Sequence, residues 1–117
     1  MLTDGQAVSI PAGSTVNVFL GRPIEFIGAP SVCRLLAVGD AAGLSLQWLI
    51  NVGGVQSAPI AAGMPVNVAA LSGQGPKDDE DAVAANVPMP AGSRNQLNVT
   101  NGSGAAILFR YRAYILP

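Results

Sequence analysis

Apolar and polar residues alternate with a period of two along most of the chain. This alternation is typical of β-strands that bury one face, and no helical segment of about 10–15 residues separates the strands. We expect about eight to ten antiparallel strands, because parallel strands need long crossover connections. The expected strands are residues 6–10, 15–20, 24–27, 31–38, 44–50, 66–71, 96–100 and 105–116. The pattern predicts an all-β protein with a single domain, residues 1–117, folded as a jelly-roll-like antiparallel β-sandwich.

A short motif occurs three times, in residues 9–18, 59–68 and 88–99. Each copy has a turn-forming group of Pro, Ala and Gly, followed by an alternating run that ends apolar-Asn-apolar. Gly and Pro favour tight turns, so we expect each copy to be a turn that leads into a strand. The copies are unevenly spaced, which favours one turn type reused within a domain over a repeat protein. Two more hairpin turns are expected at Gly53-Gly54 and Asn101-Gly102.

Residues 72–88 differ from the rest of the chain. Pro76 precedes four consecutive acidic residues, Asp78, Asp79, Glu80 and Asp81, which are followed by an alanine-rich stretch and Pro88. Acids in a first turn and a proline just beyond the end are helix start and stop signals. They predict one short helix near residues 77–86.

Charged residues make up only 11% of the chain, although 50% is hydrophobic. Globular proteins usually contain about 25% charged residues. A surface with so little charge predicts contact with other subunits. Five of the six cations are arginines, which interfaces favour because their guanidinium groups form bidentate pairs. The residues expected at an interface are Arg22, Arg34, Arg94, Arg110, Tyr111, Arg112 and Tyr114, with Asp78, Asp79, Glu80 and Asp81 as an acidic cluster.

The acidic cluster has three readings. It could be solvated, it could contact a basic patch on a neighbouring subunit, or it could bind calcium. It lacks the ligand spacing of a calcium loop, and consecutive acids cannot all face one ion. We therefore expect no metal there, and solvation is favoured over an interface contact.

The sequence contains few of the residue combinations that enzymes use for catalysis. The chain has no histidine, which excludes Ser-His-Asp and Cys-His arrangements and most zinc sites. Glu25 and Asp40 are the acids nearest to apolar strands, and nothing in the sequence pairs them as a glycosidase would require. Cys33 lies in an apolar run, where a buried small hydrophobe is expected rather than a reactive thiol. We expect no enzymatic activity and no cofactor.

Charge and hydropathy also limit the classes of partner that we expect the chain to bind. The net charge is −1 and there is no basic excess, so we expect no direct contact with nucleic acid, in spite of the mixed Arg/Tyr segment 110–114. No apolar run approaches the roughly 18 residues of a membrane span, and the first residues lack the pattern of a signal peptide. We expect no membrane association.

The composition rich in Ala, Gly, Pro and Val, the strands led by Pro-Ala-Gly and the final run 109–117, Phe-Arg-Tyr-Arg-Ala-Tyr-Ile-Leu-Pro, resemble the small β-sandwich cement or decoration proteins on the heads of tailed bacteriophages. The resemblance implies a protein made in the host cytoplasm that binds the outer capsid surface of the virion. It implies a homo-oligomer, a dimer or trimer, that stabilises contacts between major capsid protein subunits without cofactor or catalysis.

The alternative from another class is a carbohydrate- or receptor-binding module of a fibre or surface protein. Trp48, Tyr111 or Tyr114 would then form a stacking platform, although the position of Trp48 in an apolar run favours core packing. A third possibility is a small coat-forming protein that assembles without a capsid.

Overall fold

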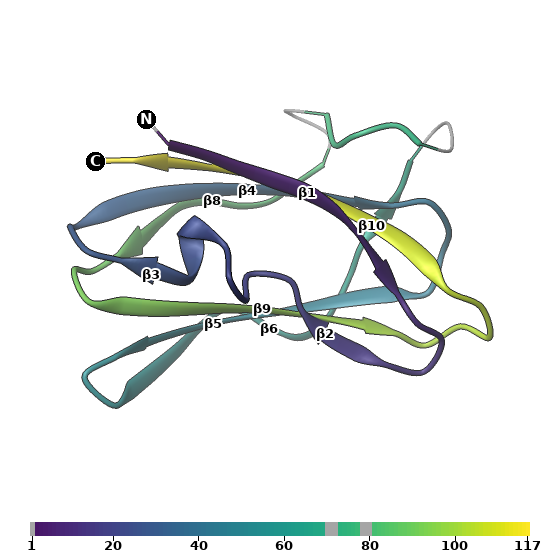
Figure 1. The fold of residues 1–117 in the computed structure, drawn as a ribbon, viewed down its shortest axis with the longest axis horizontal. Coiled ribbons are helices and arrows are strands. Elements are labelled where there is room, and N and C mark those ends of the chain that lie inside the picture. The colour runs from purple at the N-terminus through teal and green to yellow at the C-terminus, as the bar shows by residue number, and fades with distance from the viewer. Residues whose placement is uncertain (1, 70–72, 78–80) are drawn as a thin grey trace.

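Ten β-strands and one 3-10 turn, η1, form the regular structure of the residues described by the computed structural model, 2–69, 73–77 and 81–117 (Figure 1). The elements are β1 (Leu2–Ile10), β2 (Thr15–Asn17), η1 (Pro23–Glu25), β3 (Phe26–Ile27), β4 (Ser31–Gly39), β5 (Leu44–Val52), β6 (Val55–Pro65), β7 (Asn67–Val68), β8 (Ala82–Met89), β9 (Ser93–Asn101) and β10 (Ile107–Leu116). The predicted all-β class is confirmed.

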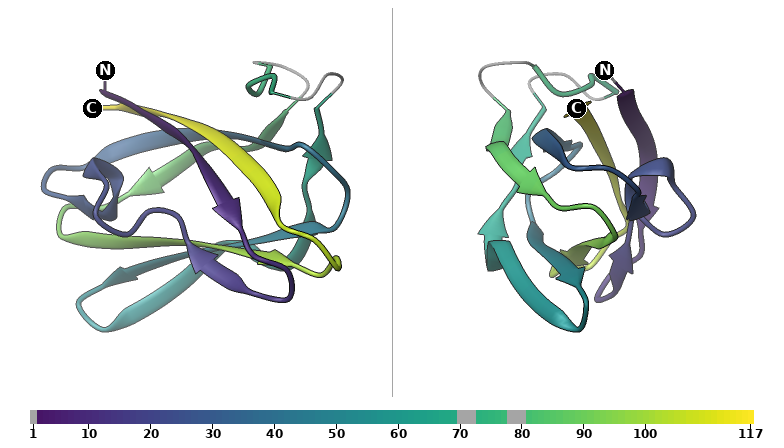
Figure 2. Two further views of the ribbon diagram at one scale, coloured as in Figure 1. Left: turned by 45° about the vertical axis from the view of Figure 1, so that its right-hand side comes forward. Right: turned by 90° about the vertical axis from the view of Figure 1, so that its left-hand side faces the viewer.

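The strands form two sheets that pack face to face (Figures 1 and 2). Sheet A has the order β1-β10-β4, with β7 and β8 pairing with successive parts of β4. Sheet B has the order β2-β9-β5-β6, with β3 continuing the line of β2 along β9. Each sheet is therefore four strands wide, and all pairs are antiparallel except β4 with β7. Successive strands repeatedly change sheet, and the resulting order is that of a jelly roll, as predicted.

The core lies between the sheets and is centred on four aromatic rings. Phe19 contacts Trp48 of sheet B edge-to-face with the ring centroids 6.3 Å apart, and Tyr111 of sheet A with the centroids 5.4 Å apart. Tyr111 also lies 6.1 Å from Phe109, centroid to centroid. All four residues are at most 2% exposed. Successive side chains of a strand point to opposite faces, and buried positions of β5, β9 and β10 alternate with more exposed ones as the sequence pattern predicts.

The predicted strand 15–20 ends early, at Asn17. The Asn17 side-chain oxygen accepts hydrogen bonds from the backbone N–H groups of Phe19 and Leu97. This bond to the residue two positions ahead turns the chain and interrupts the alternation. Phe19 is consequently buried whereas Leu20 is 64% exposed, the reverse of what a continuous strand would give. The predicted strand 24–27 is only partly formed, because Ile24 and Glu25 belong to η1 and the strand β3 contains only Phe26 and Ile27.

Two copies of the repeated motif form the predicted turns, and the second does not. Gly13 and Gly92 adopt positive φ angles of 69° and 79° in tight turns before β2 and β9. The second copy begins inside β6, which continues to Pro65. The pairing of β6 with β5 shifts register twice, because β6 has more residues than β5 between the paired positions. A strand at the edge of a sheet can bulge in this way, because only one side of it is paired.

The Asn101-Gly102 segment is not a hairpin. β9 belongs to sheet B and β10 to sheet A, so the segment connects the two sheets. Asn101 is fully buried, and its side-chain nitrogen donates to the carbonyls of Ile10 and Ala105 while its oxygen accepts from the N–H and hydroxyl of Ser103. The hydrogen bonds of the Asn101 side chain thus join the end of β1 to the segment that leads into β10. The Gly53-Gly54 hairpin between β5 and β6 forms as predicted.

The predicted helix near residues 77–86 is wrong for the described part of that range. Residues 82–86 belong to β8, whose residues Ala82 and Ala84 pair with Leu36 and Leu35 of β4. Before β8, the Asp81 N–H donates to the Lys77 carbonyl, and the Asp81 carboxylate accepts from the Lys77 N–H. Pairing with β4 then outweighs the helical propensity of the alanines.

Replacing Asn101 should strongly destabilise the fold. Asn101→Ala removes four hydrogen bonds of a fully buried side chain, one of them to the carbonyl of Ile10, so the free energy of unfolding should fall by about 2–4 kcal/mol. Urea denaturation measures this change. Asn98→Ala, on the solvent-facing side of the same strand, is the matched control and should change stability by less than about 1 kcal/mol. Equal effects of the two substitutions would contradict the role given to Asn101.

Candidate functional site

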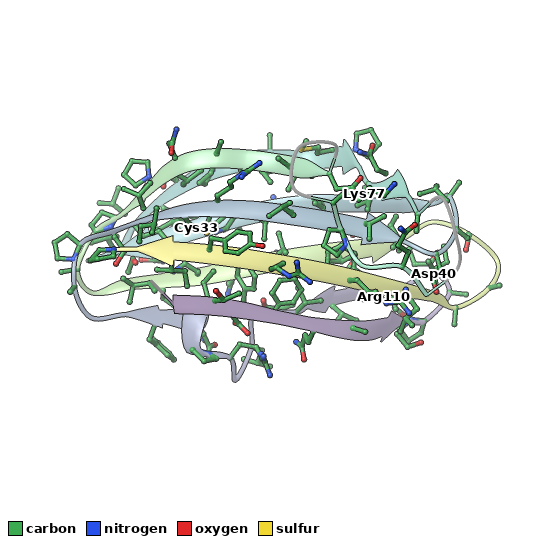
Figure 3. The ribbon with its side chains drawn as sticks, turned by 90° about the horizontal axis from the view of Figure 1, so that it is seen from above. Cys33, Asp40, Lys77 and Arg110 are labelled. Carbon is green, nitrogen blue, oxygen red and sulfur yellow. The ribbon has the colours of Figure 1, made fainter. Side chains whose placement is uncertain are left out.

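Four of the predicted interface residues lie together on the outer face of sheet A. Alternate positions of β10 place Arg110, Arg112 and Tyr114 on this face, and Tyr114 pairs in register with Arg34 of β4. Period-two alternation predicted the grouping within β10, and the strand pairing adds Arg34. Figure 3 views this face and shows Arg110 beside Asp40.

Arg110 is held within the chain. Its guanidinium group forms an ion pair with the carboxylate of Asp40, and the same carboxylate oxygen accepts a hydrogen bond from the Gly73 N–H. The side chains of Arg110 and Asp40 are both less than one-fifth exposed. The ion pair of Arg110 thus holds the loop after β4 in place, and the charge of Arg110 is not available to pair with another protein.

Arg112 is the more accessible member of the group. It is exposed, and its guanidinium lies 3.5 Å from the Tyr114 hydroxyl. Beside it is an open hollow of about 420 Å³, lined by parts of β1 and β10 and by Gly75 and Pro76. This hollow is where an acidic group of a partner could reach Arg112.

Arg22 and Arg94 lie elsewhere and are also paired. Arg22 donates to one carboxylate oxygen of the buried Asp4 from Nε and Nη2, at 3.0 and 2.6 Å. The hydrogen bond to Asp4 raises the pKa of Arg22 above its ordinary value. Arg94, on the outer face of sheet B, lies 3.8 Å from the carboxylate of Glu25 and 5.6 Å from the centre of the Phe26 ring. The predicted set therefore does not form one surface.

Two predicted interface residues point inward instead. Tyr111 is 2% exposed and belongs to the aromatic core, since odd-numbered positions of β10 face sheet B. Asp81 is 9% exposed, and its carboxylate accepts from Asn67 and from the Lys77 N–H. Neither side chain is available to a partner in this fold. Asp78, Asp79 and Glu80 lie outside the described residues.

A further surface, which was not expected from the sequence, consists of the exposed residues of β6 and β8, and we term it the neutral flank. These strands form neighbouring edges of sheets B and A and contact each other (Figure 2). Their 11 and 8 residues include no charged side chain. The available signal was a run of 36 residues, 41–76, without a charge. This uncharged run indicates an exposed surface only once it is known that β6 and β8 are edge strands.

The described residues contain no group of three or more His, Cys, Asp and Glu side chains placed to hold a metal ion. Cys33 is fully buried, and burial raises the pKa of its thiol from 9.0 to about 12. Trp48 is fully buried as well, so it cannot serve as a stacking platform for a sugar. Among the described residues, no helix has the length and apolar character that a bilayer crossing requires.

Comparisons of the chain with protein-family models, with curated proteins and with solved structures find no match. Function is therefore inferred from the chemistry of this chain alone.

The buried thiol predicts a specific reactivity and pH dependence. Native Cys33 should react with a disulfide reagent such as DTNB at pH 8 far more slowly than the chain unfolded in guanidinium chloride. The unfolded thiol ionises near 9.0 and the folded one near 12, so its contribution to stability is complete below pH 9 and is lost as pH rises toward 12. Urea denaturation between pH 8 and pH 10.5 should therefore show a decline in stability that is shallower in Cys33→Ala. Rapid native labelling, or identical declines in both proteins, would contradict this prediction.

Proposed function

We propose that the chain is a non-enzymatic structural protein, a capsid cement or decoration protein that forms a dimer or trimer and binds between major capsid protein subunits. The observation that carries the proposal is the neutral flank. Edge strands normally carry charged residues that prevent association, and β6 and β8 have none. An extended surface without charge is typical of one that another subunit covers.

The flank also suggests how a neighbour binds. β6 contains Pro59 and ends at Pro65, β8 contains Pro88, and both strands pair irregularly with their inner neighbours. Proline lacks the N–H that a sheet ladder needs, so an added strand could not pair along the whole edge. Side-chain packing against a defined neighbour is favoured over open-ended sheet extension.

Two further observations support the proposal. The jelly roll is an architecture used by viral capsid proteins, although lectins and cupins share it and fold alone does not decide function. On the outer face of sheet A, Arg112 offers an exposed cation beside a hollow, which suits an acidic group of a capsid subunit. The neutral flank would provide an apolar contact with a capsid subunit, and Arg112 would provide a polar one.

Co-sedimentation with phage heads that lack this protein tests the proposal. The wild-type chain should bind, and Ala61→Lys combined with Ala85→Lys should weaken binding by about tenfold or more, because each substitution puts an exposed charge on the flank. Ala12→Lys, in an exposed turn away from β6 and β8, is the matched control and should bind normally. Circular dichroism verifies that all three variants fold. Failure of the wild-type chain to bind heads, or equal binding by the flank variant, would defeat the proposal.

A further inference from the structure

The outer face of sheet B is polar and almost without charge. Its strands present amide and hydroxyl side chains in rows that run across the sheet, because residues paired in register point to the same side. These rows are Thr15–Thr100–Ser45, Asn17–Asn98–Gln47, Gln96–Leu49 and Phe26–Arg94–Asn51–Gln56. Residues within a row contact one another, since the hydroxyls of Thr15 and Thr100 are 2.8 Å apart and the Asn98 amide donates to the Gln47 oxygen at 3.3 Å.

The row Phe26–Arg94–Asn51–Gln56, which we term the aromatic row, differs from the others. It spans all four strands of the sheet, a width of about 14 Å. Phe26 is 65% exposed and the Arg94 side chain is 52% exposed, and the guanidinium lies against the ring. Four of the six aromatic residues of the chain are in the core, so an exposed phenylalanine on a polar face is an exception to its packing.

The aromatic row also contains a hollow. A pocket of about 70 Å³ is lined by Asn51, Gln56 and Arg94 of the row and by Leu49 and Gln96 of the next. Its volume suits one substituent of a ring rather than a whole ring. A ligand would therefore lie across the face and insert a single group.

The electrostatics of the row favour an uncharged ligand. Arg94 is the row's one charged residue, and the carboxylate of Glu25 lies 3.8 Å from its guanidinium. The side chains of Asn51, Gln56 and Gln96 each supply two donors and one acceptor oxygen, and Arg94 supplies donors. Such planar groups match the hydroxyls of a sugar, and the Phe26 ring gives a flat apolar surface for its C–H face.

We propose that the aromatic row binds a neutral polysaccharide, which lies across the outer face of sheet B and inserts one ring substituent between Asn51, Gln56 and Arg94. A lipid surface would need apolar area, of which Leu49 and Phe26 are the main sources on this face. A nucleic acid would need several cations, and the face carries one. A protein partner would find few apolar side chains to bury. This activity is additional to the proposed capsid function, and its site has only Gln56 in common with the neutral flank.

Affinity gel electrophoresis tests the proposal with three neutral polysaccharides, dextran, laminarin and galactomannan, and with alginate as the anionic comparison. At least one neutral polysaccharide should retard the native chain, and it should do so more than alginate. Asn51→Ala combined with Gln56→Ala, and separately Phe26→Ala, should weaken the interaction by about tenfold. These side chains are exposed, so the variants should stay folded.

The matched control is Gln47→Ala combined with Asn98→Ala, which removes two amides from another row of the same face. It should bind within about twofold of the wild type. In NMR spectra of the native chain, the side-chain amide signals of Asn51, Gln56 and Gln96 should shift on adding the retarding polysaccharide. The proposal is overturned if no neutral polysaccharide retards the chain, if alginate is preferred, or if both double variants lose binding equally. Phe26 lies outside the neutral flank, and Ala61 and Ala85 lie outside the aromatic row, so Phe26→Ala and the flank variant test the two proposals separately.

Discussion

The contact on which the fold depends is the insertion of Phe19 between Trp48 of sheet B and Tyr111 of sheet A. A chain with 5% aromatic residues has few large side chains with which to fill the space between two sheets. Phe19 comes from a connecting segment rather than a strand, so it can reach both sheets at once. The hydrogen bond from the Phe19 N–H to the Asn17 side chain orients that segment. The same arrangement buries Tyr111, which removes it from any interface.

Ion pairs take up most of the few charges on the strands and their loops. Asp4 with Arg22 fastens β1 to the segment before η1, Asp40 with Arg110 fastens the loop after β4 to β10, and Glu25 lies near Arg94 on β9. Partly buried pairs of this kind fix geometry more than they add stability. The consequence for the surface is larger, because β2, β3, β5, β6, β7 and β8 carry no charged residue. The neutral flank and the polar face of sheet B are both results of this distribution.

Local sequence signals predicted the features that depend on neighbouring residues. They failed for the features that depend on pairing between strands distant in the sequence. Alternation identified β1, β4, β5, β9 and β10 but not β6 or β8, and Gly53-Gly54 identified the hairpin between β5 and β6. The alanines after Asp81 signalled a helix, but pairing with β4 made them a strand. Asn101-Gly102 has the chemistry of a hairpin turn, yet the connection it forms depends on β10 joining the other sheet. The aromatic row could not be predicted at all, because it unites residues from four strands through their register.

The neutral flank and the aromatic row share an edge, and this restricts how both can be used. Gln56 ends the row on β6, the strand that also forms half of the flank. A subunit packed against the full length of β6 would lie beside Gln56, so a polysaccharide would have to extend toward β3 and Phe26 instead. The opposite end of the row is open, because Phe26 is 65% exposed on the strand that borders the other edge of sheet B. Bound to a capsid through its flank, the chain would therefore hold a sugar chain that runs from the pocket outward over Arg94 and Phe26.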